Sequence, residues 1–194
     1  MSLSAGKIQK IGKEISSKVE GKTLFDEFSR GRYSTDASVY QIKPIGVVLP
    51  KDTNDVLNLM EYSQKNSVPL LARGGGSSQC GQTVGESIVL DYSRHQNKIL
   101  EVNLEEKYVW VEPGVVLDQL NAQLKPHGLW FPVDVSTSSR ATIGGMSANN
   151  SCGSRSLYYG NMVHNVLAIE AILDDGSIST LSLIHISEPT RPYS

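Results

Sequence analysis

Long apolar runs and excess positive charge are both missing from this 194-residue sequence. A membrane-spanning helix needs roughly 18 or more consecutive apolar residues, and the first residues lead into mixed polar sequence, not into the apolar segment of a secretion signal. The 18 Lys and Arg stand against 20 Asp and Glu, which gives a formal net charge of -2. We therefore expect a cytoplasmic protein without a transmembrane segment, and we disfavour nucleic acid as a partner.

Cysteine is scarce as well. Cys80 and Cys152 are the only two cysteines, and their spacing matches neither a disulfide framework nor a zinc site. Each stands in a glycine-rich stretch, and free cysteine behaves most often as a small buried residue. We expect both thiols to be buried and no metal to be bound.

Glycine, in contrast, is concentrated in two places. Many of the 17 glycines lie in residues 74–85, the first glycine loop, and in residues 144–160, the second glycine segment. Such clusters allow the backbone to approach a ligand closely because no side chain intervenes. The 39% hydrophobic and 20% charged composition is that of an ordinary globular domain.

The hydrophobic pattern predicts a mixed α+β fold. Ile8, Ile11, Ile15 and Val19 recur at helical spacing, which indicates an amphipathic helix in an N-terminal appendage over residues 1–39. Short apolar runs predict strands, and longer periodic stretches predict helices, one of them capped by Asp52 or Thr53. The expected strands cover residues 46–49, 68–72, 87–91, 99–103, 108–112, 166–173 and 178–181, and the expected helices cover 53–66 and 116–124.

The C-terminal residues 181–194 do not read as a natural continuation. Residues 181–191 match, in order, the translation of a transposase adaptor used in sequencing libraries. We therefore interpret 181–194 as adaptor read-through and exclude it from reasoning about the fold. His185 and Glu188 are accordingly not candidates for catalysis.

The first glycine loop is a candidate anion site. Consecutive glycines after Arg73 can expose successive backbone N–H groups, which form an anion-binding nest. A plain glycine-rich turn is an equally good interpretation of the loop taken alone. Neither a P-loop nor the Gly-x-Gly-x-x-Gly pattern fits, so ATPase and Rossmann interpretations are weakened.

The second glycine segment offers a similar possibility. Ser138 or Ser139 is expected to cap a short helix that begins near Ala141, so that its N-terminus faces a negative group. Arg140 and Arg155 suit a phosphate or a carboxylate, although surface salt bridges are the more common role. A ligand with two phosphates would account for both glycine clusters.

Several ordered motifs follow one another along the chain, at residues 47–50, 69–78 with Gly81, 111–115, 141–145, 149–153 and 159–160. Together they resemble the vanillyl-alcohol-oxidase/p-cresol-methylhydroxylase type of FAD-binding domain over residues 40–180. Within that superfamily, residues 33–38, 93–98 and 136–140 look most like the branch of glycolate oxidase subunits, D-lactate dehydrogenases and D-2-hydroxyglutarate dehydrogenases. The resemblance implies two α/β subdomains, the second one truncated.

The same resemblance implies which residues bind FAD. The residues implied to bind the pyrophosphate group are Arg73, Gly74, Gly75, Gly76, Ser77, Ser78 and Gly81. The flavin is expected to lie along Pro132, Asp134, Ala141, Thr142, Gly144, Gly145, Asn149 and Gly153. Some relatives attach FAD through a histidine in the first loop. Because residues 73–85 contain no histidine, noncovalent FAD is implied.

The implied activity is oxidation of a D-2-hydroxy acid of the lactate, glycolate or 2-hydroxyglutarate class. Electrons would pass to a second acceptor: a quinone, a cytochrome, an electron-transfer flavoprotein or a fused iron–sulfur region. The expected location is cytoplasmic, with membrane association through such an electron-transfer partner as the alternative. The alternatives are a non-catalytic flavin-binding module and an NADPH-dependent sugar-nucleotide reductase of the same flavin fold.

The resemblance places the catalytic base and the substrate-binding residues C-terminal to this chain. We therefore expect the 194-residue chain to be an N-terminal fragment that does not turn over substrate. The hairpin near residues 166–180 should expose apolar surface, since its edges lack partners. Low solubility would follow from that exposure.

Overall fold

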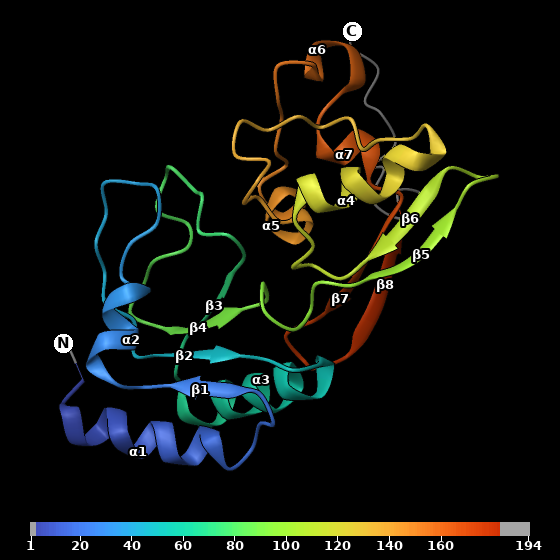
Figure 1. The fold of residues 1–194 in the computed structure, drawn as a ribbon. Coiled ribbons are helices and arrows are strands. Elements are labelled where there is room, and N and C mark those ends of the chain that lie inside the picture. The colour runs from blue at the N-terminus through green and yellow to red at the C-terminus, as the bar shows by residue number, and fades with distance from the viewer. Residues whose placement is uncertain (1–2, 183–194) are drawn as a thin grey trace, which may run out of the picture.

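The computed structural model describes residues 3–182, which form two lobes (Figure 1). The first lobe, residues 3–92, is built on a four-stranded sheet with the strand order β1-β2-β4-β3. β1 (Lys22–Leu24) pairs antiparallel with β2 (Gly46–Leu49), while β2, β4 (Ile88–Asp91) and β3 (Leu70–Arg73) are parallel. β4 therefore lies between the two strands that α3 (Thr53–Asn66) connects.

Apolar side chains on both faces hold this sheet in place. β2 and β4 are buried along their whole length, which is typical of parallel strands covered on both sides. On one face Val48 and Ile88 pack with Ile11 and Ile15 of α1 (Ala5–Ser16) and with Leu59 of α3. The segment expected to be an appendage thus supplies α1, β1 and α2 (Glu27–Arg32), and α1 shares the core of the sheet.

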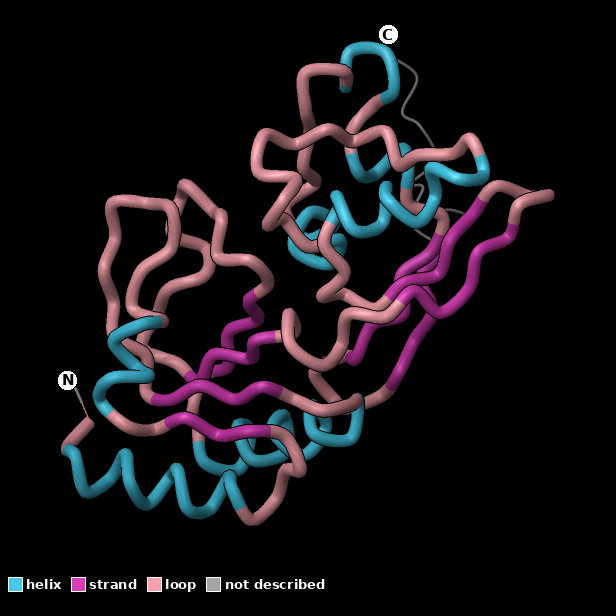
Figure 2. Tube along the Cα trace, viewed as in Figure 1, coloured by secondary structure: helices cyan, strands magenta, loops and turns pink. Residues whose placement is uncertain are grey.

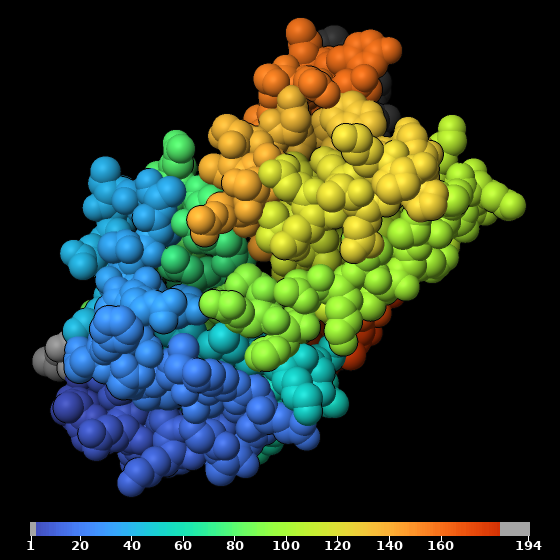
Figure 3. Space-filling model, in the orientation of Figure 1, coloured from blue at the N-terminus to red at the C-terminus, as the bar shows by residue number. Residues whose placement is uncertain are grey.

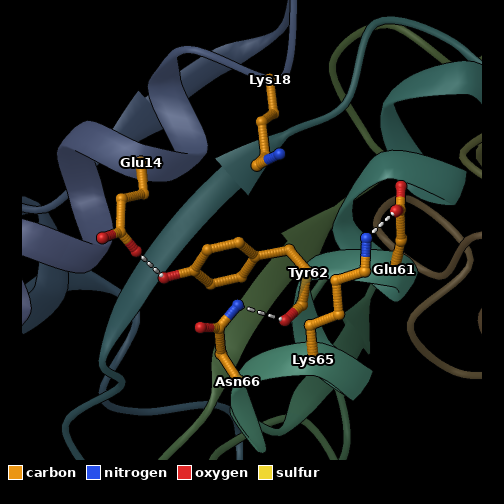
Figure 4. A pocket seen from close by; sticks show the side chains of 6 residues that line it. All are labelled: Glu14, Lys18, Glu61, Tyr62, Lys65 and Asn66. Atoms are coloured by element: carbon orange, nitrogen blue, oxygen red, sulfur yellow. Dashed lines mark hydrogen bonds and ion pairs between the residues drawn. The ribbon is translucent and has the colours of Figure 1, made fainter.

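Polar side chains form hydrogen bonds at the edge of the α1–α3 interface (Figure 4). The Tyr62 hydroxyl donates a hydrogen bond of 2.6 Å to Glu14 Oε2, and the Asn66 amide donates to the Tyr62 carbonyl at 2.9 Å. Burial and the Glu14 carboxylate raise the pKa of Tyr62 to about 12. Lys65 pairs with Glu61 on the exposed side of α3.

The second lobe, residues 93–182, combines two hairpins with short helices. Two small hydrophobic cores lie within it, one around Val115, Leu120 and Leu124 and the other around Val133 and Met146. Figure 2 shows long loops on either side of these helices. The elements are β5 (Ile99–Asn103), β6 (Tyr108–Val111), α4 (Leu117–Leu124), η1 (Lys125–His127), α5 (Ile143–Ala148), α6 (Ser156–Tyr159), α7 (Met162–Asn165), β7 (Ala168–Ile172) and β8 (Ile178–Ser182).

The hairpin of β7 and β8 exposes apolar side chains, as expected. Ile178 is 50% exposed and Ile169 is 39% exposed, and the two strands form a two-stranded sheet by themselves. Leu181 and Ser182, the first residues of the segment interpreted as adaptor read-through, belong to β8. The remainder of that segment, including His185 and Glu188, lies outside the described residues.

The mixed α+β architecture is confirmed, and each strand or helix expected within residues 46–181 is present to within a few residues. The expectation that the cysteines are buried is wrong. Both Cys80 and Cys152 are exposed, because each stands in an irregular loop and not in a packed element. No helix in residues 3–182 is long and apolar enough to cross a membrane.

One buried carboxylate joins the N-terminal segment to the sheet. Asp55, in the first turn of α3, is 2% exposed. Its two oxygens accept hydrogen bonds from the backbone N–H groups of Glu20 at 2.7 Å and of Gly21 and Lys51 at 2.8 Å. A charged acceptor therefore satisfies amides from two chain segments that would otherwise be unpaired.

Replacing this carboxylate should destabilise the whole first lobe. We expect Asp55→Ala to lower the free energy of unfolding by about 3 kcal/mol, because buried amides are left without an acceptor. Urea unfolding followed by circular dichroism measures this change. Asp52→Asn is the matched control: it removes a charge one turn away but keeps the side-chain cap of α3. Equal effects of the two substitutions would contradict the assignment.

Candidate functional site

The first glycine loop begins where β3 ends. β2, β3 and β4 run parallel, so their carboxyl ends share one edge of the sheet, where open α/β sheets bind ligands. Figure 3 shows the loop, in green, between the blue segment that follows α2 and the orange second glycine segment. The Gln82 amide bridges to Asn149 Oδ1 at 3.3 Å, so the predicted site does bring the two glycine clusters together.

The backbone amides of the first loop are the outstanding chemical feature of the site. Within residues 3–182, no hydrogen bond uses the N–H groups of residues 74–78 as donors. Gly76 has a φ of 64°, a conformation that glycine adopts without strain. A run of amides without acceptors in a positive-φ loop is the arrangement expected of an anion-binding nest.

Close contact between the lobes explains two of the glycines. A Cβ on Gly74 would overlap the hydroxyl of Thr142, and a Cβ on Gly75 would overlap the carbonyl oxygen of Arg140. Gly81, with a φ of 78°, lies against Tyr40, whose Cδ2 atom would be 2.6 Å from an added Cβ. The loop is therefore wedged between the second lobe and the chain that precedes β2.

The second glycine segment does not form the anion site that its sequence suggests. The N-cap of α5 is Thr142, not Ser138 or Ser139, and its Oγ1 accepts from the Gly145 amide at 3.4 Å. The amide of Ile143 donates to the Val115 carbonyl at 2.8 Å, and the amide of Gly144 donates to the Pro113 carbonyl at 2.9 Å. The chain at 113–115 therefore occupies the donors of the first turn.

Asp134 organises the turn that contains Gly153. Its carboxylate accepts a 3.0 Å hydrogen bond from the Arg155 amide and a 2.8 Å hydrogen bond from the Ser154 hydroxyl. The backbone hydrogen bond from Arg155, followed by that from Ser154, holds the pKa of Asp134 below its ordinary value. Arg155 also forms a salt bridge with Asp134 at 3.6 Å and stacks over Trp130, which is the surface role considered for it.

The other predicted residues fall into two groups. Ala141 is buried beside Thr142, whereas Pro132 is half-buried in the loop before α5. Ser77 is half-buried, and the Ser78 hydroxyl pairs with Gln82. The structure thus places Gly74, Gly75, Gly76, Ser77, Ser78, Thr142, Gly145 and Asn149 around the meeting point of the glycine clusters, and Asp134 and Gly153 at a separate turn.

Sequence reasoning missed the neighbours of Arg73. Its guanidinium donates to the Thr83 carbonyl at 3.1 Å and to the Thr35 carbonyl at 2.8 Å, and lies 5.3 Å from the centre of the Tyr33 ring. Burial lowers the pKa of Arg73, while Asp91 and Asp36 oppose that shift. The only sequence signal near these neighbours was the motif at residues 33–38. It indicates a branch of the family, but it does not predict that these residues contact Arg73.

Comparison with known proteins supports a flavin site. The sequence model of the family described as "FAD binding domain" matches residues 44–182. The chain is 42% identical to D-2-hydroxyglutarate dehydrogenase of Haemophilus influenzae over 172 residues, or 86% of this chain, and it spans 16% of that relative's length. It is 36% identical to the glycolate oxidase subunit GlcD of Bacillus subtilis, over 88% of this chain and 37% of the relative.

A solved structure shows the same fold. Physcomitrella patens BBE-like 1 variant D396N superposes with a TM-score of 0.76, at 20% identity, over 88% of this chain and 37% of the other. At that sequence identity, the similarity shows only that the two proteins share a fold. The described part of the chain contains no cluster of side chains suited to a metal ion.

Filling the space at the meeting of the lobes should disrupt the site. We expect Gly75→Ala to cost about 1–3 kcal/mol of stability, because the new methyl group meets the Arg140 carbonyl, which cannot move aside freely. Binding of FAD should weaken in parallel, as measured by quenching of flavin fluorescence. Gly85→Ala is the control in the same loop, since its Cβ finds its nearest neighbour at 3.5 Å. An unaffected Gly75→Ala variant would disprove the close packing.

The turn around Asp134 should depend on pH. The folded pKa of Asp134 lies below the ordinary value of 3.8, so its stabilising contribution is fully present above that value and disappears as the pH falls through the folded pKa. We expect Asp134→Asn to be less stable than the wild type at about pH 6, and the difference to shrink progressively below about pH 4. Urea unfolding across this range measures both proteins. A difference independent of pH would contradict the assigned hydrogen bonds.

Proposed function

Because the chain belongs to the FAD binding domain family, we propose that it is the flavin-binding part of an oxidoreductase that oxidises a D-2-hydroxy acid. The matching relatives include proteins named for D-2-hydroxyglutarate, D-lactate and glycolate. FAD is the cofactor that the family implies. The substrate belongs to the lactate, glycolate or 2-hydroxyglutarate class, and a second acceptor receives the electrons.

The amides of residues 74–78 carry the flavin part of this proposal. They lie at the carboxyl end of β3, and they have no acceptor within the described chain. A diphosphate supplies anionic oxygens for such donors, and hydrogen bonds to charged groups are stronger than neutral ones. The donor set therefore fits the pyrophosphate of FAD, with Gly74, Gly75, Gly76, Ser77, Ser78 and Gly81 as its cradle.

The second lobe would hold the rest of the cofactor. We assign Pro132, Ala141, Thr142, Gly144, Gly145 and Asn149 to the wall beside the flavin, with Asp134 and Gly153 shaping the turn at its end. These residues bind and orient, whereas bound FAD supplies the two-electron acceptor for the hydroxy acid. No histidine lies in the first loop, which supports noncovalent attachment.

Titration with flavins tests the binding part. We expect the 194-residue chain to bind FAD at least about tenfold more tightly than riboflavin, because riboflavin has no phosphate for the amides of the first loop. Quenching of flavin fluorescence measures both affinities. Equal affinity for the two flavins would disprove a pyrophosphate site at residues 74–78.

The proposed activity belongs to a longer protein that includes this chain, since the chain spans 16% of the D-2-hydroxyglutarate dehydrogenase that it matches. Under anaerobic conditions, a D-2-hydroxy acid should bleach the bound flavin of the longer protein, while the 194-residue chain should show no turnover. Bleaching by NADPH alone would instead identify a reductase. Stable FAD without bleaching by either compound would identify a binding module.

A further inference from the structure

Residues 33–41 precede the matched family region, which begins at residue 44, yet they lie directly against the first glycine loop. Figure 3 shows this blue segment beside the green loop. The Thr83 hydroxyl donates to Asp36 Oδ2 at 3.0 Å, the Tyr40 ring fills the space above Gly81, and Thr35 accepts from Arg73. The loop is therefore held along one side by chain outside the family domain.

Arg73 links the segment, the loop and the sheet. One terminal nitrogen of its guanidinium donates to the Thr83 carbonyl and the other to the Thr35 carbonyl. The Tyr33 ring lies beneath the guanidinium, and the Tyr33 hydroxyl donates to Asp91 Oδ2 of β4 at 2.6 Å. A Cβ on Gly76 would overlap a terminal nitrogen of Arg73, so the guanidinium packs against the loop backbone.

The segment has hydrogen bonds of its own that fix its shape. Asp36 Oδ1 accepts from the Ser38 amide at 2.8 Å, and the Ser38 hydroxyl accepts from the Tyr40 amide at 3.1 Å. Thr35 and Gln41 form an antiparallel bridge. The segment is thus a closed turn whose ends are tied together, and it presents fixed acceptors to Arg73 and Thr83.

We propose that residues 33–41 are a brace, and that Arg73 is a positioning residue that uses the brace to hold the first glycine loop open for the pyrophosphate before FAD arrives. Arg73 acts through the loop and does not bind phosphate itself. Moving its guanidinium to a phosphate would require two hydrogen bonds and the Tyr33 contact to break. The inference rests on the proposed flavin function for its biological meaning, although the brace itself does not depend on FAD.

Backbone ¹⁵N relaxation of the cofactor-free 194-residue chain tests the brace directly. We expect Asp36→Ala and Arg73→Gln each to lower the order parameters of residues 74–85 from about 0.85 to below about 0.6, while α3 and β2 keep their wild-type values. Arg32→Gln is the control, since it removes the same charge from an exposed position beside the brace. Unchanged order parameters in the loop would overturn the proposal. An equal fall throughout the protein would also overturn it, because that outcome indicates a merely structural role.

FAD affinity separates a brace from a phosphate ligand. If Arg73 acts through the loop, Asp36→Ala and Arg73→Gln both weaken FAD binding, and the double variant is no weaker than the weaker single variant. Arg73→Lys should resemble Arg73→Gln, because an ammonium group cannot bridge two carbonyls and stack on Tyr33. If Arg73→Lys binds normally and Asp36→Ala has no effect, Arg73 is a phosphate ligand and the proposal fails. If the wild-type chain does not bind FAD, the proposed function fails while the relaxation result still decides on the brace.

Discussion

The backbone contact between Gly74 and Gly75 on one side and Thr142 and Arg140 on the other determines how the two lobes meet. Neither glycine has room for a Cβ there, and each lobe has hydrophobic cores of its own. Any side chain at this contact would separate the lobes and widen the site. The same lack of side chains leaves the amides of the loop uncovered, so a packing requirement and a binding property arise from the same two residues.

In the packed parts of the fold, polar groups find their partners within the chain. Every buried side-chain polar atom in residues 3–182 has a hydrogen-bond partner. Asp55 gathers three backbone amides onto one carboxylate, and the first turn of α5 donates its amides to neighbouring carbonyls. The amides of residues 74–78 have no acceptor within residues 3–182, and they lie in half-buried or exposed chain beside the second lobe. They are therefore available to donate to an external anion.

The sequence predicts local features well and distant contacts poorly. The helical spacing of Ile8, Ile11 and Ile15, the cap at Asp52 and the hairpin turn before β8 are each decided within a few residues, and all are present. The position of β4 between β2 and β3 depends on packing that periodicity does not encode. The cap at Thr142 was missed for a similar reason, since carbonyls at residues 113–115 fix where α5 begins.

The same limit applies to the boundary of the domain. A family match that begins at residue 44 suggests that the earlier residues are dispensable, but α1 contributes Ile15 to the core and β1 pairs with β2 along its length. Without them the face of the sheet that α1 covers and the edge that β1 pairs would both be exposed. The Thr35 and Asp36 contacts extend this dependence to the first glycine loop. The physical unit that shapes the site therefore begins at α1, well before the residues that define the family.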